Sequence, residues 1–118
     1  MKFILYTTML VSLLLAGCVS STTKSRTATY KSLNPNNSEW AIHATADTGS
    51  FGSAIVIFVN NNEIIKGDLN IGTGIGHFSG KYEGKAIDAE CSLDQKGFSM
   101  FNRCKIFIDS KEFTELTF

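Results

Sequence analysis

Residues 76–91 read GHFSGKYEGKAIDAEC, and their pattern is the clearest indication of the fold. At its centre, the dipeptide Glu83-Gly84 separates two short runs of alternating residues. Glycine tolerates the positive φ that a two-residue turn of a β-hairpin demands. The stretch therefore predicts an antiparallel hairpin with strands over residues 76–82 and 85–93.

The turn also predicts which residues face each other across the hairpin. One face is apolar and joins Gly80 to Ile87, Phe78 to Ala89, and Gly76 to Cys91. The opposite face is mostly polar and joins Lys81 to Ala86, Ser79 to Asp88, and His77 to Glu90. A slip of one residue would exchange the two faces, so this separation of apolar from polar residues supports the register.

The other predicted strands are short runs rich in Ile, Val and Phe, separated by Gly, Asn and Asp. They cover residues 40–46, 53–59, 63–71, 99–109 and 112–118. No window of useful length shows the helical spacing of apolar residues. The chain is therefore expected to be all-β, a small antiparallel meander of about six to seven strands. Both a barrel and a sandwich satisfy this pattern.

A second turn is predicted at Asn60-Asn61-Asn62, because asparagine adopts left-handed backbone geometry more readily than most residues. The segments beside it, 55–59 and 64–65, are apolar on both faces. The pattern therefore leaves their register open and favours a place at the centre of the fold. Trp40 begins the first strand and is expected in the core, with a recognition role on the rim as the alternative.

Two cysteines of the predicted domain, Cys91 and Cys104, are expected to form a disulfide. Alternation places Cys91 on a face with Ile87 and Ala89, and Cys104 on a face with Ile106. If the chain is exported, as its first residues indicate below, a pair of this kind favours a disulfide, which in a small domain contributes about 3 kcal/mol of stability. A metal site with two thiolates and a histidine is the weaker alternative, because the chain has no closely spaced cysteine pair.

The first residues have the parts of a secretory signal. Lys2 supplies positive charge, and an apolar run over residues 3–14 leads into Leu15-Ala16-Gly17-Cys18. This arrangement resembles the lipobox of bacterial lipoprotein precursors, and an ordinary signal peptide with a chance cysteine is the alternative. The resemblance implies cleavage before Cys18, lipid on its sulfur, and, since Val19 is not Asp, transport to the outer membrane.

Three segments follow from this interpretation: a signal peptide over 1–17, a lipidated cysteine and flexible tether over 18–38, and a β domain over 39–118. The tether is rich in Ser, Thr, Asn and Lys and contains the only proline, Pro35. Such a composition buries too little apolar surface to offset the entropy of ordering. A random coil of this length would hold the domain roughly 25 Å from the lipid. An extra strand over residues 28–33 is the alternative.

Charge and motifs limit the possible functions. The chain has 11 basic and 11 acidic side chains, so it lacks the clustered positive charge that nucleic acid requires. The sequence contains no GxSxG, HExxH, Walker-loop or EF-hand motif, so no catalytic residue, metal or cofactor is expected. The best acid–base pair is His77 opposite Glu90, which is interpreted as an ordinary cross-strand pair. Residues 93–103 contain Phe98 and Phe101 on opposite faces and form the candidate contact surface.

The first hypothesis is therefore a non-catalytic interaction module, held at the outer membrane through lipid and binding a protein or envelope polymer. A structural accessory lipoprotein of a secretion, pilus or conjugation assembly is the alternative. An envelope hydrolase that uses His77 and Glu90 is a second alternative.

Overall fold

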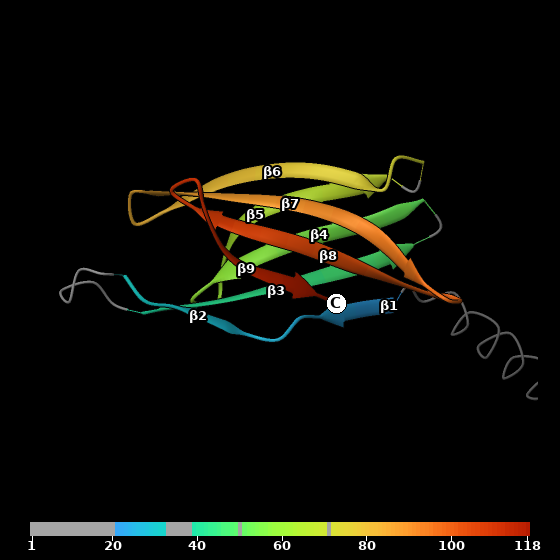
Figure 1. Ribbon diagram of the computed structural model, residues 1–118, viewed down its shortest axis with the longest axis horizontal. Coiled ribbons are helices and arrows are strands. Elements are labelled where there is room, and N and C mark those ends of the chain that lie inside the picture. Colours follow the sequence, from blue (N-terminus) through green and yellow to red (C-terminus); the bar gives the residue numbers. More distant parts are fainter. Residues whose placement is uncertain (1–20, 33–38, 50, 71) are drawn as a thin grey trace, which may run out of the picture.

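The computed structural model describes residues 21–32, 39–49, 51–70 and 72–118 (Figure 1). All regular structure in these residues is β. The nine strands are β1 (Ser21–Lys24), β2 (Ala28–Tyr30), β3 (Trp40–Gly49), β4 (Gly52–Val59), β5 (Asn62–Asn70), β6 (Ile75–Tyr82), β7 (Lys85–Lys96), β8 (Ser99–Ile108) and β9 (Lys111–Thr117). The all-β prediction is confirmed, with two strands more than the seven predicted.

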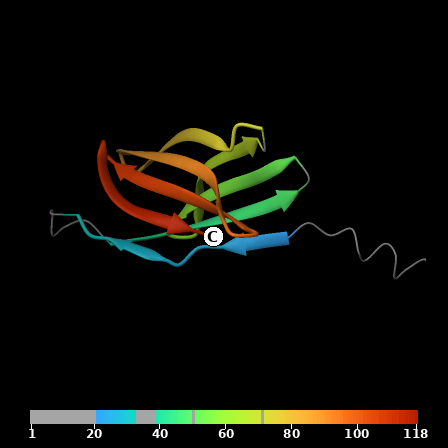
Figure 2. The same cartoon turned by 45° about the vertical axis from the view of Figure 1, so that its right-hand side comes forward.

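The strands form two antiparallel sheets. In the first sheet, β3 pairs with β1 and β2 along one edge and with β4 along the other, and β5 lies beyond β4. The second sheet has the order β6-β7-β8-β9. Neighbouring strands follow one another in sequence from β3 to β5 and from β6 to β9, as expected of a meander. The two sheets face each other across a common core, so the molecule is a sandwich (Figures 1 and 2).

The predicted hairpin is confirmed residue by residue. Gly80 pairs with Ile87, Phe78 with Ala89, and His77 with Glu90. Glu83 and Gly84 form the turn with φ values of 48° and 79°, which is the left-handed geometry that a two-residue hairpin turn requires.

The asparagine turn is also confirmed, and the structure supplies the register that the pattern left open. Asn60 and Asn61 have φ values of 50° and 64°. A bulge interrupts the ladder between Ile57 and Phe58, because Ile57 pairs with Ile65 whereas Phe58 pairs with Glu63. One extra residue of β5 therefore lies in the bulge, which alternation alone does not reveal.

The expected tether requires a correction in its described part, because β1 and β2 both lie within residues 18–38. Ser21–Lys24 and Ala28–Tyr30 pair with β3, and the buried Ser25 between them exchanges backbone and side-chain hydrogen bonds with Ala44. An edge strand needs only its backbone to pair, so a run of Ser and Thr can form one despite its polar side chains. Cys18 and residues 33–38 lie outside the described residues.

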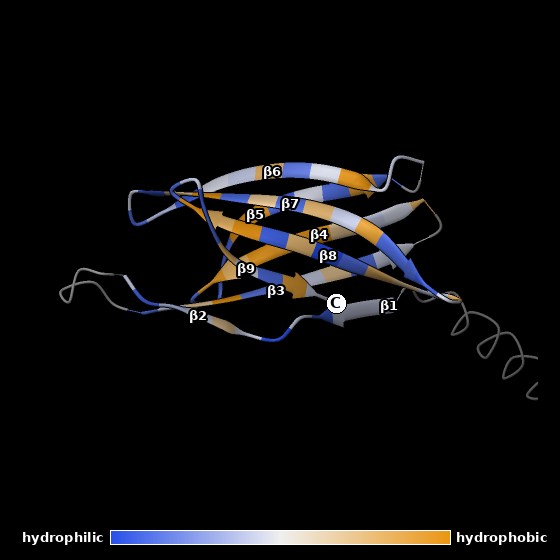
Figure 3. Ribbon diagram, viewed as in Figure 1, coloured by the Kyte–Doolittle hydropathy of each residue, from blue (hydrophilic) through white to orange (hydrophobic). Residues whose placement is uncertain are grey.

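The core consists of the inward faces of both sheets. Its largest fully buried side chains are Ile42, Ile55, Ile57, Val59, Leu69, Ile87, Cys91, Cys104, Ile106 and Leu116. Along β6, β7 and β8, hydrophobic and hydrophilic residues alternate, as expected of strands with one buried face (Figure 3). Cys91 and Cys104 lie directly opposite each other on β7 and β8 and form the predicted disulfide.

Trp40 fills one end of this core, as the sequence predicted. Its ring lies 5.1 Å from the rings of both Tyr30 and Tyr82, measured between centroids. The indole Nε1 donates a hydrogen bond of 3.1 Å to Glu83 Oε2, so its polar atom is satisfied. The tryptophan thereby connects β3 to the turn between β6 and β7.

The sheets approach closely at β5 and β6. A Cβ at Gly67 would lie 2.3 Å from the ring of Phe78, and a Cβ at Gly80 would lie 2.7 Å from the Ile64 carbonyl oxygen. At the opposite edge, Arg26 Nη2 donates hydrogen bonds of 3.0 Å to Thr114 Oγ1 and to the Glu115 carbonyl. Small residues along one edge and polar contacts along the other thus hold the sheets together.

Candidate functional site

The outer face of the first sheet carries a row of apolar side chains along its middle strand. β4 reads GSAIVIFV, so alternation places apolar residues on both of its faces. Ile55 and Ile57 are buried in the core, while Ala54, Val56 and Phe58 lie on the outer face with Ala54 exposed and the other two partly exposed. We call Ala54, Val56 and Phe58 the β4 row.

Polar side chains border the β4 row on both neighbouring strands. The residues that pair with it are Asp47, Thr45 and His43 on β3, and Asp68, Lys66 and Glu63 on β5. An apolar centre with a polar rim is the usual arrangement of a protein–protein contact surface. The row lies on a sheet face rather than on loops, so its shape is fixed by the backbone ladder.

His43 extends the apolar centre. Its ring stacks on Phe58 with 4.7 Å between centroids and 6° between planes. Burial, and secondarily the positive charge of Lys24, lower the pKa of His43 below 6.5. The imidazole is therefore uncharged at neutral pH and contributes an aromatic surface to the row.

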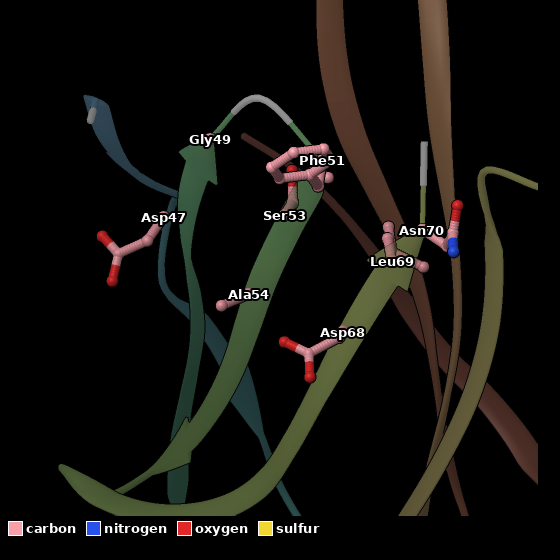
Figure 4. Close-up of a pocket in the computed structure, with 9 residues that line it drawn as sticks. Asp47, Gly49, Phe51, Ser53, Ala54, Asp68, Leu69 and Asn70 are labelled. Atoms are coloured by element: carbon pink, nitrogen blue, oxygen red, sulfur yellow. The ribbon is translucent and has the colours of Figure 1, made fainter. Parts of the chain in front are cut away.

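A depression of about 440 Å³ lies at the end of the β4 row where β3 turns into β4. Asp47 and Asp68 both pair with Ala54 from opposite sides, and Figure 4 shows the two carboxylates flanking it. Phe51 lies above Ser53 at the rim of this depression (Figure 4). This end of the row therefore combines an aromatic ring with negative charge.

The outer face of the second sheet differs in its chemistry. Arg103 lies between two carboxylates, with Nη2 3.0 Å from Asp94 Oδ2 and Nε 3.2 Å from Glu115 Oε1. A shallow depression of about 480 Å³ opens beside it and is lined by His77 and Glu90 among others. The Arg103 guanidinium also lies over the ring of Phe101, with its central carbon 5.7 Å from the ring centroid. Much of the charge on this face is already paired within the chain.

The geometry argues against the hypothesis that His77 and Glu90 act as a catalytic acid–base pair. The two residues pair in register as predicted, but His77 Nε2 lies 3.6 Å from Asp88 Oδ1. The same oxygen of Asp88 accepts a hydrogen bond from the Ser79 hydroxyl. An activated serine needs its base beside the hydroxyl and a carboxylate behind the base, whereas here the carboxylate lies between the two.

The predicted contact surface, residues 93–103, is most exposed at its tip, the connection between β7 and β8. Phe98 is fully exposed, whereas Phe101 is half-buried beneath Arg103. The β4 row was not predicted as a site. Its signal was present in the uninterrupted apolar run of residues 54–59, which was interpreted only as a central strand.

Comparison with protein-family models, with curated proteins and with solved structures returned no match. Within the described ranges, no three His, Cys, Asp or Glu side chains gather as metal ligands would. The same residues contain no helix that is long and apolar enough to cross a bilayer.

Proposed function

We propose that this chain is a lipid-anchored lipoprotein of the outer membrane whose β-sandwich binds a protein partner without catalysing a reaction. The observation that supports this function is the β4 row, an apolar strip on the outer face of a sheet whose inner face already fills the core. A strand with two apolar faces buries only one of them within the molecule. The second face is available to a partner.

The shape of the face favours a protein over a small molecule. Small ligands prefer concave pockets that enclose most of their surface, whereas the β4 row lies on an extended sheet face with a shallow depression at one end. Asp47 and Asp68, which lie on either side of Ala54, would face basic side chains of the partner.

The anchor rests on the resemblance of Leu15-Ala16-Gly17-Cys18 to a lipobox. Several acyl chains on one cysteine make a lasting attachment, because each buried CH₂ contributes about 0.8 kcal/mol and a single chain is marginal. Replacing Cys18→Ser is expected to abolish labelling by radioactive palmitate and to leave the precursor uncleaved. Normal labelling of this variant would contradict the anchor.

The binding face is tested by a photoreactive amino acid in place of Val56, with the same group in place of Lys105 as the matched control. Val56 lies in the middle of the β4 row, whereas Lys105 is exposed on the outer face of the second sheet. Irradiation of intact cells is expected to produce one discrete adduct from position 56 and none from position 105. The adduct should disappear when Phe58→Asp is added. Equal adducts from both positions, or one from position 105 alone, would overturn the assignment.

A further inference from the structure

Among the residues that the structure describes, four large apolar side chains are strongly exposed, and all four lie at one end of the sandwich. They are Phe51 (87% exposed), Ile75 (73%), Phe98 (105%) and Met100 (56%). Phe51 belongs to the connection between β3 and β4, Ile75 begins β6, and Phe98 and Met100 belong to the connection between β7 and β8 and the strand after it. We call this the apolar end.

The opposite end has a different composition. Three tight turns lie there, Asn60-Asn61, Glu83-Gly84 and Asp109-Ser110. The connection from β2 to β3 also lies at this end, and its residues 33–38 are outside the described residues. All three pairs have positive φ, and none of their side chains is apolar. Figures 1 and 2 show the two sets of connections at opposite ends of the strands. A meander places alternate connections at opposite ends, so the four exposed apolar side chains and the three polar turns lie at opposite ends of the described strands.

The apolar end is also where the described chain begins. Ser21 starts β1 and pairs with Thr48, immediately beside the connection from β3 to β4. Cys18 precedes Ser21 by only three residues, which can extend over at most about 11 Å. A lipid on Cys18 would therefore lie close to the apolar end, whereas the polar turns lie a full strand length away.

We propose that the apolar end lies against the phospholipid bilayer, with Phe51, Ile75, Phe98 and Met100 inserted at the boundary between headgroups and acyl chains. This inference rests on the proposed lipid anchor at Cys18. Side chains of this kind enter that boundary in other membrane-surface proteins, and their burial adds to the affinity of the anchor. Lys96, exposed two residues before Phe98, is placed to contact lipid phosphate.

A bilayer fits this end better than a folded protein does. The four side chains come from three separate parts of the two sheets, the β3–β4 connection, the start of β6 and the tip formed by β7 and β8. A fluid lipid surface accommodates apolar side chains that are separated from one another, whereas a folded partner would need a separate pocket for each of them. With this end on the membrane, the strands rise away from the bilayer and the β4 row stands clear of it, with Ala54 nearest to the lipid and Phe58 farthest from it.

Fluorescence in vesicles tests the orientation. The lipidated protein is reconstituted into vesicles of phosphatidylethanolamine and phosphatidylglycerol, with and without bromine on the acyl chains. Phe51→Trp and Phe98→Trp place a probe at the apolar end, and Lys111→Trp places one beside a polar turn. Bromine is expected to quench the added emission of the first two variants and to leave the third unchanged. The unmodified protein, whose Trp40 is buried in the core, supplies the baseline.

The outcomes separate this inference from the anchor. If the lipidated protein floats with the vesicles but bromine quenches positions 51 and 98 no more than position 111, the orientation is refuted and the lipoprotein assignment stands. If the tryptophans at positions 51 and 98 are shielded from solvent in intact cells but not in vesicles, a protein covers this end and the inference falls. If palmitate does not label the protein at all, the anchor fails and the inference falls with it.

Discussion

The two sheets of the sandwich share one core but differ in what they present to the outside. The second sheet carries all the ion pairs found on strands and turns of the described chain, including those of Arg103 and the pair between Lys85 and Asp109, and it contains the disulfide. The described outer face of the first sheet has no ion pair and instead exposes the β4 row. The second sheet is therefore crosslinked and pairs part of its charge within the chain, whereas the first sheet exposes the apolar strip that we propose binds a partner.

The largest expected effect comes from removing the crosslink of the second sheet. Replacing both Cys91→Ala and Cys104→Ala opens a loop between residues separated by 13 positions and is expected to lower the free energy of unfolding by about 3 kcal/mol. Urea unfolding followed by circular dichroism measures the change. Reduction of the unmodified protein should reproduce most of it. An unchanged midpoint would mean that the second sheet does not depend on its crosslink.

A smaller effect is expected at the edge where the two sheets meet. In Gly67→Ala, the new Cβ would lie 2.3 Å from the ring of Phe78, so either that ring or the strands β5 and β6 must shift. Overpacking of this kind costs roughly 1–3 kcal/mol. Gly49→Ala is the matched control, because its Cβ would meet no atom within 4 Å. Equal stability of the two variants would show that the packing of Phe78 against β5 adapts without cost.

The hairpin at Glu83-Gly84 was predictable from sequence because a single local turn fixes both of its faces. Cys91 and Cys104 could be paired for the same reason, since alternation carries their side chains to adjacent inward positions. The strand β1 was not predicted, and β2 was considered only within the alternative strand over residues 28–33, because the pairing of both depends on the exposed edge of β3 rather than on their own side chains. Edge pairing is a tertiary effect that a polar sequence does not reveal.

The candidate site was predictable only in part. The apolar run of residues 54–59 indicated a strand with two buried faces, but sequence does not show whether a second layer covers the outer one. Only the sheet order reveals that no other described strand lies over the β4 row. The clustering of Phe51, Ile75 and Phe98 likewise required the topology, because these residues are far apart in the chain.

Replacing one aromatic residue on each sheet by serine tests whether the outer faces of the two sheets differ in binding. Phe58 and Phe107 are both half-buried on outer faces, one in the β4 row and the other among the charges of the second sheet. Phe58→Ser and Phe107→Ser are each expected to lower the free energy of unfolding by less than about 1 kcal/mol, the scale of a cross-strand pair. Phe58→Ser alone should abolish the adduct from the photoreactive group at position 56. Loss of the adduct in both variants would mean that binding does not distinguish the two faces.

The smallest expected effect is a pH dependence that belongs to the first sheet. Because burial and Lys24 lower the pKa of His43, the unfolded chain binds more protons at this residue than the folded chain does in the range between the two pKa values. The free energy of unfolding should therefore be highest above pH 6.5 and should fall as the pH drops through 6.5 toward the folded pKa. Urea midpoints across this range should lose this contribution in His43→Gln, which cannot titrate. A slope that is unchanged in His43→Gln would place the titrating group elsewhere and would leave the stacking on Phe58 as the only established role of this histidine.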